Sequence, residues 1–402
     1  VLTLSELDDA FLGWLWVRGA EADAELARRW CAEERLSARE SVARANLDRW
    51  RRQRLLYMQR ALVPMLENAK RSVFSRLDLE ATAQLYAQSA ADLPITATSD
   101  ATTSDPMASV RAEMFRSAVL RHRTEAGWHE HESAAFTRLR ELIVGGAQVA
   151  PADPRRAVLD DQIVWGRSPV RFDLAGGWTD TPPYCLEYGG RVLNVAVDLN
   201  GQPPIQAFAK YSTSPELVIR SIDLGIEERI RTWDELDTFG RPGEDFGLAK
   251  AALALAGFLP QFHAGPSHAS LQEQLERLGG GIELSMLCAV PKGSGLGTSS
   301  ILAATLLGTL SDLCGLGWDH DVLFDRTLAL EQLLTTGGGW QDQAGGMFRG
   351  LKLVETDPGM TQDPLLRWLP EQLLGPDHAN RTVLLYYTGL TRVAKDILHE
   401  IV

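Results

Sequence analysis

A glycine-rich decapeptide between a predicted strand and a predicted helix constrains this chain most. The segment PKGSGLGTSS spans residues 291–300, follows the strand-like run ELSMLCAV and precedes the apolar run ILAATLLGTL. Glycines let backbone N–H groups approach phosphate oxygens closely, and the N-terminus of the next helix directs its positive dipole end at the same anion. We therefore predict a nucleotide-phosphate site formed by Pro291, Lys292, Gly293, Ser294, Gly295, Leu296, Gly297, Thr298, Ser299 and Ser300.

Single residues exclude two better-known phosphate loops. No Gly-Lys-Ser/Thr follows, so the segment is not a Walker A loop, and Thr298 stands where a dinucleotide fingerprint needs its third glycine. Without the Walker lysine, the phosphate charge must be balanced by the helix end and magnesium, with Lys292 as a further candidate. Taken alone, the segment is also compatible with a glycine-rich turn that binds nothing.

Two acidic residues further along the chain are candidates for phosphoryl-transfer chemistry. Glu331 lies three residues from both Leu328 and Leu334, so on a helix it shares their apolar face. A lone buried carboxylate is costly, so we expect a cation partner, either magnesium or an arginine. Asp342 lies in the glycine-framed loop GGGWQDQAGG. There it could accept the proton of an attacking hydroxyl, and the alternative is an Asx-turn residue.

Residues 169–180, PVRFDLAGGWTD, together with the loop at 291–300 resemble the first two signature motifs of the GHMP kinases. This is the superfamily of galactokinase, homoserine kinase and mevalonate kinase. In the family a helical glutamate precedes the catalytic aspartate by eleven positions and binds magnesium with a loop serine, and Glu331 and Asp342 keep that interval. The resemblance implies ATP and Mg²⁺ as cofactors, with Ser299 as the loop ligand and Thr298 as the alternative.

The same resemblance implies roles for the first motif. Arg171 matches the arginine that pairs with the catalytic aspartate, so Arg171 and Asp342 are the expected catalytic residues, with Asp342 either a true base or an orienting group. Asp180 matches the aspartate that holds sugar hydroxyls, and Gly177, Trp178 and Asp342 complete the expected sugar-binding set. The alternative role for Asp180 is a helix N-cap before Thr181.

The extended first motif, GGWTD followed by TPPYCLEYGGRVLNVAVDLNGQPPI, resembles the fucokinase branch over about residues 160–402. This implies ATP-dependent phosphorylation of the anomeric hydroxyl of L-fucose to β-L-fucose 1-phosphate, in GDP-fucose salvage. Heptose 1-kinases share Gly-Gly-x-Thr-Asp and Trp-Gln-Asp-Gln, so a heptose-phosphate or galactose-type sugar 1-kinase is the alternative. A catalytically silent sensor or a scaffold is the alternative of another class.

The fold implied is α+β: a GHMP kinase fold with a ribosomal-protein-S5-like N-terminal lobe and part of a ferredoxin-like C-terminal lobe, preceded by a helical region. We predict a helical connecting region over 1–150, as lies between the two activities of bifunctional fucokinase/GDP-fucose pyrophosphorylases. The N-terminal lobe follows over 151–355, and the start of the C-terminal lobe over 356–402. The third glycine-rich motif of the family should follow the last residues, so we expect the 402-residue chain alone to be inactive or weakly active.

Local patterns add detail to this scheme. A capping box at Ser37 and Glu40 predicts a helix running through Leu47, Trp50 and Leu55, and a second helix is expected from Ser109 to Val144. Residues 94–106 are predicted to form a loop. The run VLNVAVDL followed by Asn200 and Gly201 predicts a strand that enters a tight hairpin, although Pro203 and Pro204 weaken its return strand.

Composition excludes several classes of protein. The formal net charge of −13 argues against a nucleic-acid surface and suits a neutral sugar better than a polyanion. No run has the length of a membrane span and no signal peptide is evident, so we expect a cytoplasmic protein. Cys31, Cys185, Cys288 and Cys314 are expected to be reduced and buried. His129 and His131 are expected on a solvated helix face and not at a metal.

Overall fold

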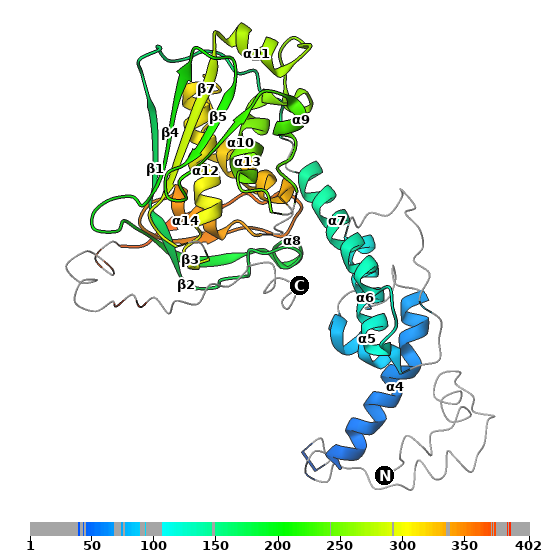
Figure 1. Cartoon of the computed structure of the whole chain (residues 1–402). Coiled ribbons are helices and arrows are strands. Elements are labelled where there is room, and N and C mark those ends of the chain that lie inside the picture. The colour runs from blue at the N-terminus through cyan, green and yellow to red at the C-terminus, as the bar shows by residue number, and fades with distance from the viewer. Residues whose placement is uncertain are drawn as a thin grey trace, which may run out of the picture. The chain divides into compact units, whose positions relative to one another are not determined.

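The computed structural model describes residues 46–67, 77–88, 107–146 and 149–370, except Pro242, Lys292 and 335–337, together with a few single residues outside these ranges. The chain divides into two units, Val1–Ala135 and Phe136–Val402. The described part of the first unit is helical (Figure 1). Its helices are α4 (Leu47–Glu67), α5 (Leu79–Ala87), α6 (Ala108–Arg123) and the start of α7 (Trp128–Gly146), which continues into the second unit.

The helices of the first unit share a small apolar core. Leu62 of α4, Tyr86 of α5 and Phe115 of α6 are buried in one cluster. The Tyr86 and Phe115 rings meet edge to face with centroids 5.5 Å apart, an arrangement that aromatic quadrupoles favour. Asp78 starts α5 by accepting a hydrogen bond from the backbone N–H of Ala81 at 2.7 Å.

The sequence predictions for this unit hold only in part. Ser37 and residues 94–106 lie outside the described residues. The helix predicted through Leu47 is interrupted, because Asn46 is not helical and its side chain caps α4 by accepting from the Arg49 N–H at 2.9 Å. The single helix predicted from Ser109 to Val144 is wrong: α6 and α7 are separate, since Thr124 and Gly127 take positive φ values of 56° and 94°.

Two sheets and the helices packed on them form the second unit. The first sheet has the order β1-β4-β7-β5-β6, with β5 and β7 parallel and the other pairs antiparallel. The second has the order β2-β3-β8-β9 and is antiparallel throughout. The strands are β1 (Val164–Ser168), β2 (Val170–Ala175), β3 (Arg191–Val197), β4 (Ile205–Ser212), β5 (Leu217–Ser221), β6 (Ile226–Ile230), β7 (Gly281–Cys288), β8 (Leu351–Glu355) and β9 (Leu365–Trp368).

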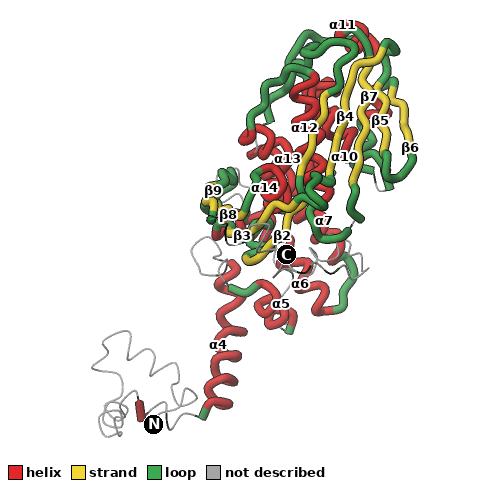
Figure 2. The backbone as a smooth tube through the Cα atoms, turned by 90° about the vertical axis from the view of Figure 1, so that its left-hand side faces the viewer, coloured by secondary structure: helices red, strands yellow, loops and turns green. Residues whose placement is uncertain are grey.

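Helices cover one side of the five-stranded sheet (Figure 2). Helix α12 packs on β1 and β4 and also contacts α10, α13 and α14. Its Leu306, Leu307 and Leu310 are fully buried, so the apolar run that follows the glycine loop forms the centre of the main core. The helices of this unit are α8 (Tyr184–Tyr188), α9 (Trp233–Leu236), α10 (Gly247–Leu253), α11 (Leu271–Leu278), α12 (Thr298–Leu313), α13 (His320–Leu333) and α14 (Gln341–Met347), with the short turns η2 (Ala254–Phe258) and η3 (Pro260–Phe262).

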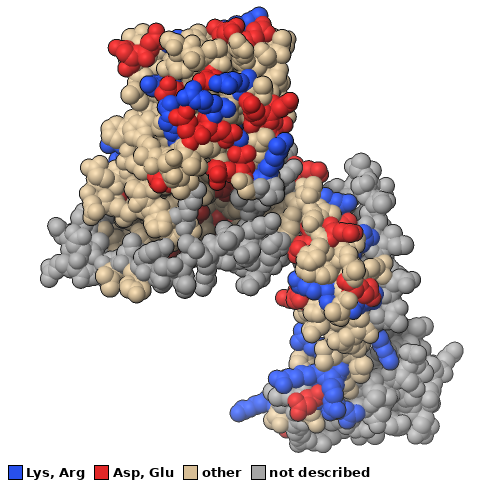
Figure 3. Space-filling view, viewed as in Figure 1, with Lys and Arg blue, Asp and Glu red and all other residues tan. Residues whose placement is uncertain are grey.

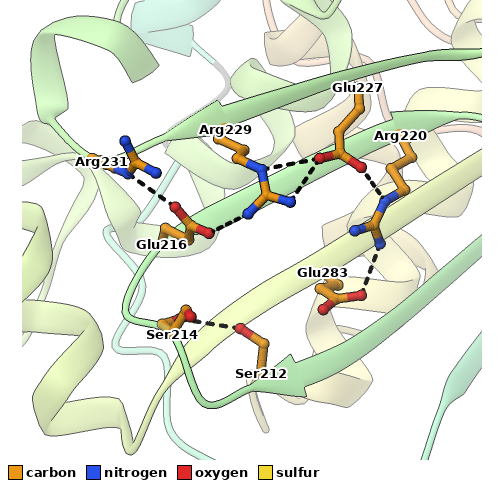
Figure 4. Close-up of polar contacts among 8 residues, drawn as sticks. All are labelled: Ser212, Ser214, Glu216, Arg220, Glu227, Arg229, Arg231 and Glu283. Atoms are coloured by element: carbon orange, nitrogen blue, oxygen red, sulfur yellow. Dashed lines mark hydrogen bonds and ion pairs between the residues drawn. The ribbon is translucent and has the colours of Figure 1, made fainter.

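The face of the sheet away from these helices carries an alternating ladder of charges. Arg220 bridges Glu227 and Glu283 at 2.6 and 2.7 Å, and Arg229 bridges Glu227 and Glu216 (Figure 4). Figure 3 shows basic and acidic side chains intermingled on the surface of this unit. Because opposite charges alternate across neighbouring strands, this face is stable in water without a covering layer.

The predicted hairpin after β3 is only partly correct. Asn200 and Gly201, with φ values of 51° and 71°, make the tight turn, and Leu199 and Gln202 exchange backbone hydrogen bonds across it. The chain then leaves β3, because β4 pairs with β1 and β7 in the other sheet. Pro203 and Pro204 lack the N–H groups that a continued ladder would need.

The structure also describes three of the four cysteines and both histidines named above. Cys185 and Cys314 are buried, Cys288 is only half-buried, and Cys31 lies outside the described residues. His129 is exposed, as expected, but His131 is half-buried and its Nδ1 lies 2.6 Å from the buried Glu113 carboxylate. Over the described parts of the chain, none of the helices has the length and apolar character needed to cross a membrane. The lobe boundary at residue 355 stays a prediction.

Candidate active site

The glycine loop lies between β7 and α12, as predicted. Gly293, Gly295 and Gly297 all take positive φ values, between 70° and 76°. Glycine adopts this conformation without the steric cost that a Cβ brings. A Cβ on Gly297 would lie 3.2 Å from both Arg171 Nε and Asp342 Cγ. The loop therefore touches the predicted catalytic pair directly and leaves the first N–H groups of the 16-residue helix α12 beside it.

Arg171 and Asp342 meet at this loop. Arg171, on β2, donates from Nε to Asp342 Oδ1 at 2.8 Å and from its Nη1 group to the carbonyl of Gly295 at 3.1 Å. A third partner is Asp173, whose Oδ2 lies 2.8 Å from the same guanidinium. Burial alone would lower the pKa of Arg171, but Asp342 and Asp173 outweigh it and raise the pKa, so the guanidinium stays charged.

A serine hydroxyl links the other predicted acid to this pair. Ser300, in the first turn of α12, donates from Oγ to Glu331 Oε1 on α13 and lies 3.5 Å from Asp342 Oδ2. Glu331 is 7% exposed. Burial raises its pKa to about 8, against the lowering effect of the Ser300 hydrogen bond and helped by the nearby Asp342 and Asp180. The prediction that Glu331 lies on a buried helix face is confirmed.

This group of oxygens suits a magnesium ion held together with a nucleotide. Among the described residues no group of three or more His, Cys, Asp or Glu side chains forms a metal site. Mg²⁺ needs no such group, since it commonly binds one or two carboxylates and takes its remaining ligands from substrate phosphates and water. Burial disfavours the charged form of Glu331, and a bound cation beside the carboxylate would offset this cost.

The three hydroxyl residues at the start of α12 are placed differently from the expectation. Ser299 is exposed at the start of α12 and lies on no described carboxylate, whereas Thr298 and Ser300 are buried. Ser300 is the hydroxyl that reaches Glu331. Its helical neighbours Ala303 and Ala304 are buried, so the apolar phase of α12 was the signal in the sequence that could have selected Ser300. Lys292 lies outside the described residues.

Asp342 lies in the first turn of α14 and not in a loop as predicted, and Asp180 lies under the start of this helix. It is fully buried, and its Oδ2 accepts the backbone N–H of Gln341 at 2.9 Å. Burial raises its pKa to about 7, against the hydrogen bond from Gln341. A Cβ on Gly339 would come within 2.1 Å of Asp180 Oδ2, so glycine is needed there for this close approach. The Asp180 side chain holds the start of α14, and the N-cap position of α8 is occupied by Pro183 instead.

Gly177 and Trp178, the two other predicted sugar-site residues, lie near the start of α14. Gly177 is exposed, and a Cβ there would first meet Gln341 Oε1 at 3.5 Å. Trp178 is half-buried and holds a positive φ of 73°, which is uncommon for a bulky residue. The tight turn of the GGWTD segment thus brings Gly177 next to the helix that carries Asp342.

Sequence reasoning missed a buried polar row on the second sheet. Asp173, Asn194 and Lys352 lie opposite one another on β2, β3 and β8. Asn194 and Lys352 are fully buried, and burial lowers the pKa of Lys352 to about 8 although the Asp173 carboxylate raises it. The one available signal was the two-residue spacing of Arg171 and Asp173, which puts both side chains on one face of a strand.

Comparisons with known proteins concern the family of this chain and its relatives. Residues 267–350 match the GHMP kinases N terminal domain. The chain is 48% identical to the L-fucokinase/L-fucose-1-P guanylyltransferase of Bacteroides fragilis over 373 residues, which are 93% of this chain and 39% of that protein. It is 34% identical over 237 residues to the bifunctional fucokinase/GDP-fucose pyrophosphorylase of Arabidopsis thaliana, covering 58% of this chain and 21% of that protein.

A solved structure, a D-glycero-D-manno-heptose 1-phosphate kinase from Bacteroides thetaiotaomicron, overlaps 52% of this chain and 60% of its own, with 21% identity and a TM-score of 0.40. Residues 267–350 thus correspond to the N-terminal domain of the GHMP kinases, as the resemblance implied, and the expected α+β fold class is confirmed. It spans well under half the length of the two fucokinase relatives.

Proposed function

We propose that this chain is the kinase part of an enzyme that transfers the terminal phosphoryl group of ATP to the anomeric hydroxyl of L-fucose, giving β-L-fucose 1-phosphate. The observation that carries this proposal is the meeting of Arg171, Ser300, Glu331 and Asp342 at the N-terminus of α12. The choice of L-fucose is supported by the two relatives named as fucokinases.

The residues at this site have separate tasks in the proposed reaction. The glycine loop and the N-terminus of α12 bind the phosphates of ATP through backbone N–H groups. Glu331 and Ser300 would hold Mg²⁺, which supplies positive charge to the phosphate oxygens when bound. Arg171 holds the Asp342 carboxylate in place and stabilises the negative charge that develops on the transferred group.

Asp342 is the group that faces the acceptor. Its Oδ1 is bound by Arg171, while Oδ2 lies 3.5 Å from Ser300 Oγ, and its side chain is 27% exposed. That exposure leaves room for a sugar hydroxyl, which Asp342 would orient and whose proton it would accept as the new P–O bond forms. Gly177 and Trp178 border the sugar, and Asp180 acts through the backbone of Gln341.

The chemistry of the site defines its partners. We propose MgATP and a neutral sugar as the ligands and the cytoplasm as the compartment. Both fucokinase relatives carry a second, nucleotide-transferring activity in their names. We propose a fused or adjacent nucleotidyltransferase region for the full protein and assign no part of that activity to the residues described above.

The test is a coupled ADP-release assay of the full-length protein with L-fucose, D-galactose, D-arabinose and heptose 7-phosphate. We expect turnover with L-fucose to exceed that with the other three sugars. Asp342→Asn should remove most of it, by about 100-fold or more, because the neutral amide cannot accept the hydroxyl proton. Turnover that is absent for all four sugars would contradict the kinase proposal, and a preference for heptose 7-phosphate would correct the substrate.

A further inference from the structure

A row of three polar side chains crosses the four-stranded sheet beneath α14. Asp173 pairs in register with Asn194, and Asn194 pairs in register with Lys352. Residues in register on neighbouring strands point to the same face, and Asp173 also shares the face of Arg171, two residues before it on β2. The row therefore lies on the side of the sheet that carries the catalytic arginine.

The row is bonded to the helix that carries Asp342. Asn194 Nδ2 donates to the carbonyl of Gln341 at 3.5 Å, and Lys352 Nζ donates to the carbonyl of Gly345 at 3.1 Å. At its other end, Asp173 Oδ2 pairs with the Arg171 guanidinium at 2.8 Å. Asn194 and Lys352 thus hold α14, while Asp173 and Asp342 share one arginine.

Three acceptor oxygens at this place receive no hydrogen bond from the described residues. Asp173 Oδ1 and Gln341 Oε1 are both buried, and neither has a hydrogen-bond partner among the described residues; the same is true of Asn194 Oδ1 behind them. A buried acceptor that stays unpaired destabilises the fold, because it has lost its hydrogen bonds to water. A bound ligand that supplies hydrogen-bond donors would satisfy several such atoms in one place.

Gly177 marks where such a ligand would enter. The residue is exposed, and a Cβ on it would lie 3.5 Å from Gln341 Oε1 and 4.0 Å from Asp173 Oδ2. No other heavy atom outside Asp173 lies as close, so the two side chains line the space in front of Gly177. A larger residue at 177 would fill that space.

We propose that Asp173 and Gln341 form a subsite that accepts ring hydroxyls of the sugar, and that Asp173 is the residue that selects the acceptor. Asn194 and Lys352 are positioning residues that keep the subsite beside Asp342. This inference rests on the proposed kinase function and adds a site for hydroxyls that do not react. A charged acceptor built for a hydroxyl discriminates strongly against an analogue that lacks it, because the buried carboxylate oxygen is then left unpaired.

The test compares Asp173→Asn with the unchanged full-length protein. We expect the KM for the sugar to rise about 10- to 100-fold, the range for losing a hydrogen bond to a charged group, while the KM for ATP stays the same. Single-deoxy derivatives of the accepted sugar identify the hydroxyl involved. One derivative that the unchanged protein rejects should be rejected much less by Asp173→Asn. Asp234→Asn, an exposed carboxylate on α9, makes the same charge change as a control.

A second variant decides the question if Asp173→Asn does not fold. Gln341→Ala removes a side-chain oxygen without an internal partner, so it should melt like the unchanged protein and still raise the KM for the sugar. If both variants are active and keep the sugar KM and the deoxy-sugar profile of the unchanged protein, the subsite is overturned and the kinase proposal stands. An unchanged protein without sugar-dependent ADP release would overturn the kinase proposal and the subsite with it.

Discussion

The guanidinium of Arg171 on β2 donates to the carboxylate of Asp342 on α14 at 2.8 Å, although 171 residues separate the two in the sequence. The same guanidinium also holds the carbonyl of Gly295 in the glycine loop. One side chain of β2 therefore connects the glycine loop with helix α14. This makes Arg171 the most sensitive position for a conservative test.

Arg171→Lys should be nearly inactive although the charge is kept. A lysine ammonium is a compact point charge and cannot span Asp342, Asp173 and Gly295 at once. We expect kcat in the ADP-release assay to fall about 100-fold or more, as for the loss of a transition-state donor. Arg167→Lys is the matched control, because Arg167 only stacks on the exposed Trp165 at 4.4 Å. Equal activity of the two variants would show that the shared arginine is dispensable.

Ser300→Ala should weaken the use of magnesium more than Ser299→Ala. Ser300 bonds to the buried Glu331, whereas Ser299 is exposed. We expect the Mg²⁺ concentration for half-maximal activity to rise about 10- to 100-fold in Ser300→Ala. Ser299→Ala should resemble the unchanged protein. The reverse ranking in a magnesium titration would restore Ser299 as the loop ligand.

Asp180→Asn should change how stability depends on pH. The pKa of Asp180 is raised from 3.8 to about 7 by burial, so between these values the folded protein keeps a proton that the unfolded chain has lost. The free energy of unfolding therefore falls as pH rises through this window, in total by on the order of 4 kcal/mol from this group.

Urea unfolding of both proteins between pH 4 and pH 8 measures this effect. The amide introduced by Asp180→Asn can still accept from Gln341 but does not titrate. We therefore expect the variant to gain stability relative to the unchanged protein as pH rises, with the gain complete above about pH 7. A difference between the two proteins that is constant with pH would show that Asp180 titrates normally.

Gly297→Ala should cost more activity than stability. Its φ of 73° is strained for alanine, at about 1–2 kcal/mol, and its new Cβ would crowd Arg171 and Asp342 at 3.2 Å. Gly225→Ala is a matched control, since Gly225 has a φ of 67° and a Cβ added there would meet no atoms within 4 Å. We expect similar losses in melting temperature but lost kinase activity only in Gly297→Ala. Parallel loss of activity in both would indicate general destabilisation.

Most residues of the candidate site could be predicted from the residue pattern. The glycine loop between a strand and a helix, the buried phase of Glu331 and the glycine frame of Asp342 each follow from local rules of backbone freedom and helical periodicity. Local rules failed where distant segments compete. The turn at Asn200 and Gly201 formed as predicted, but β4 joined another sheet, because strand partners are chosen by packing over the whole unit.

The sequence by itself predicted the class of protein and the candidate residues for phosphate and magnesium, because those predictions depend on residue types at short spacings. Tertiary structure alone decided that Ser300 and not Ser299 reaches Glu331, that Asp180 is buried under Gln341, and that Asp173, Asn194 and Lys352 form one row. Each of these depends on the rotation of a helix or the register between strands, which are set by contacts between residues far apart along the chain.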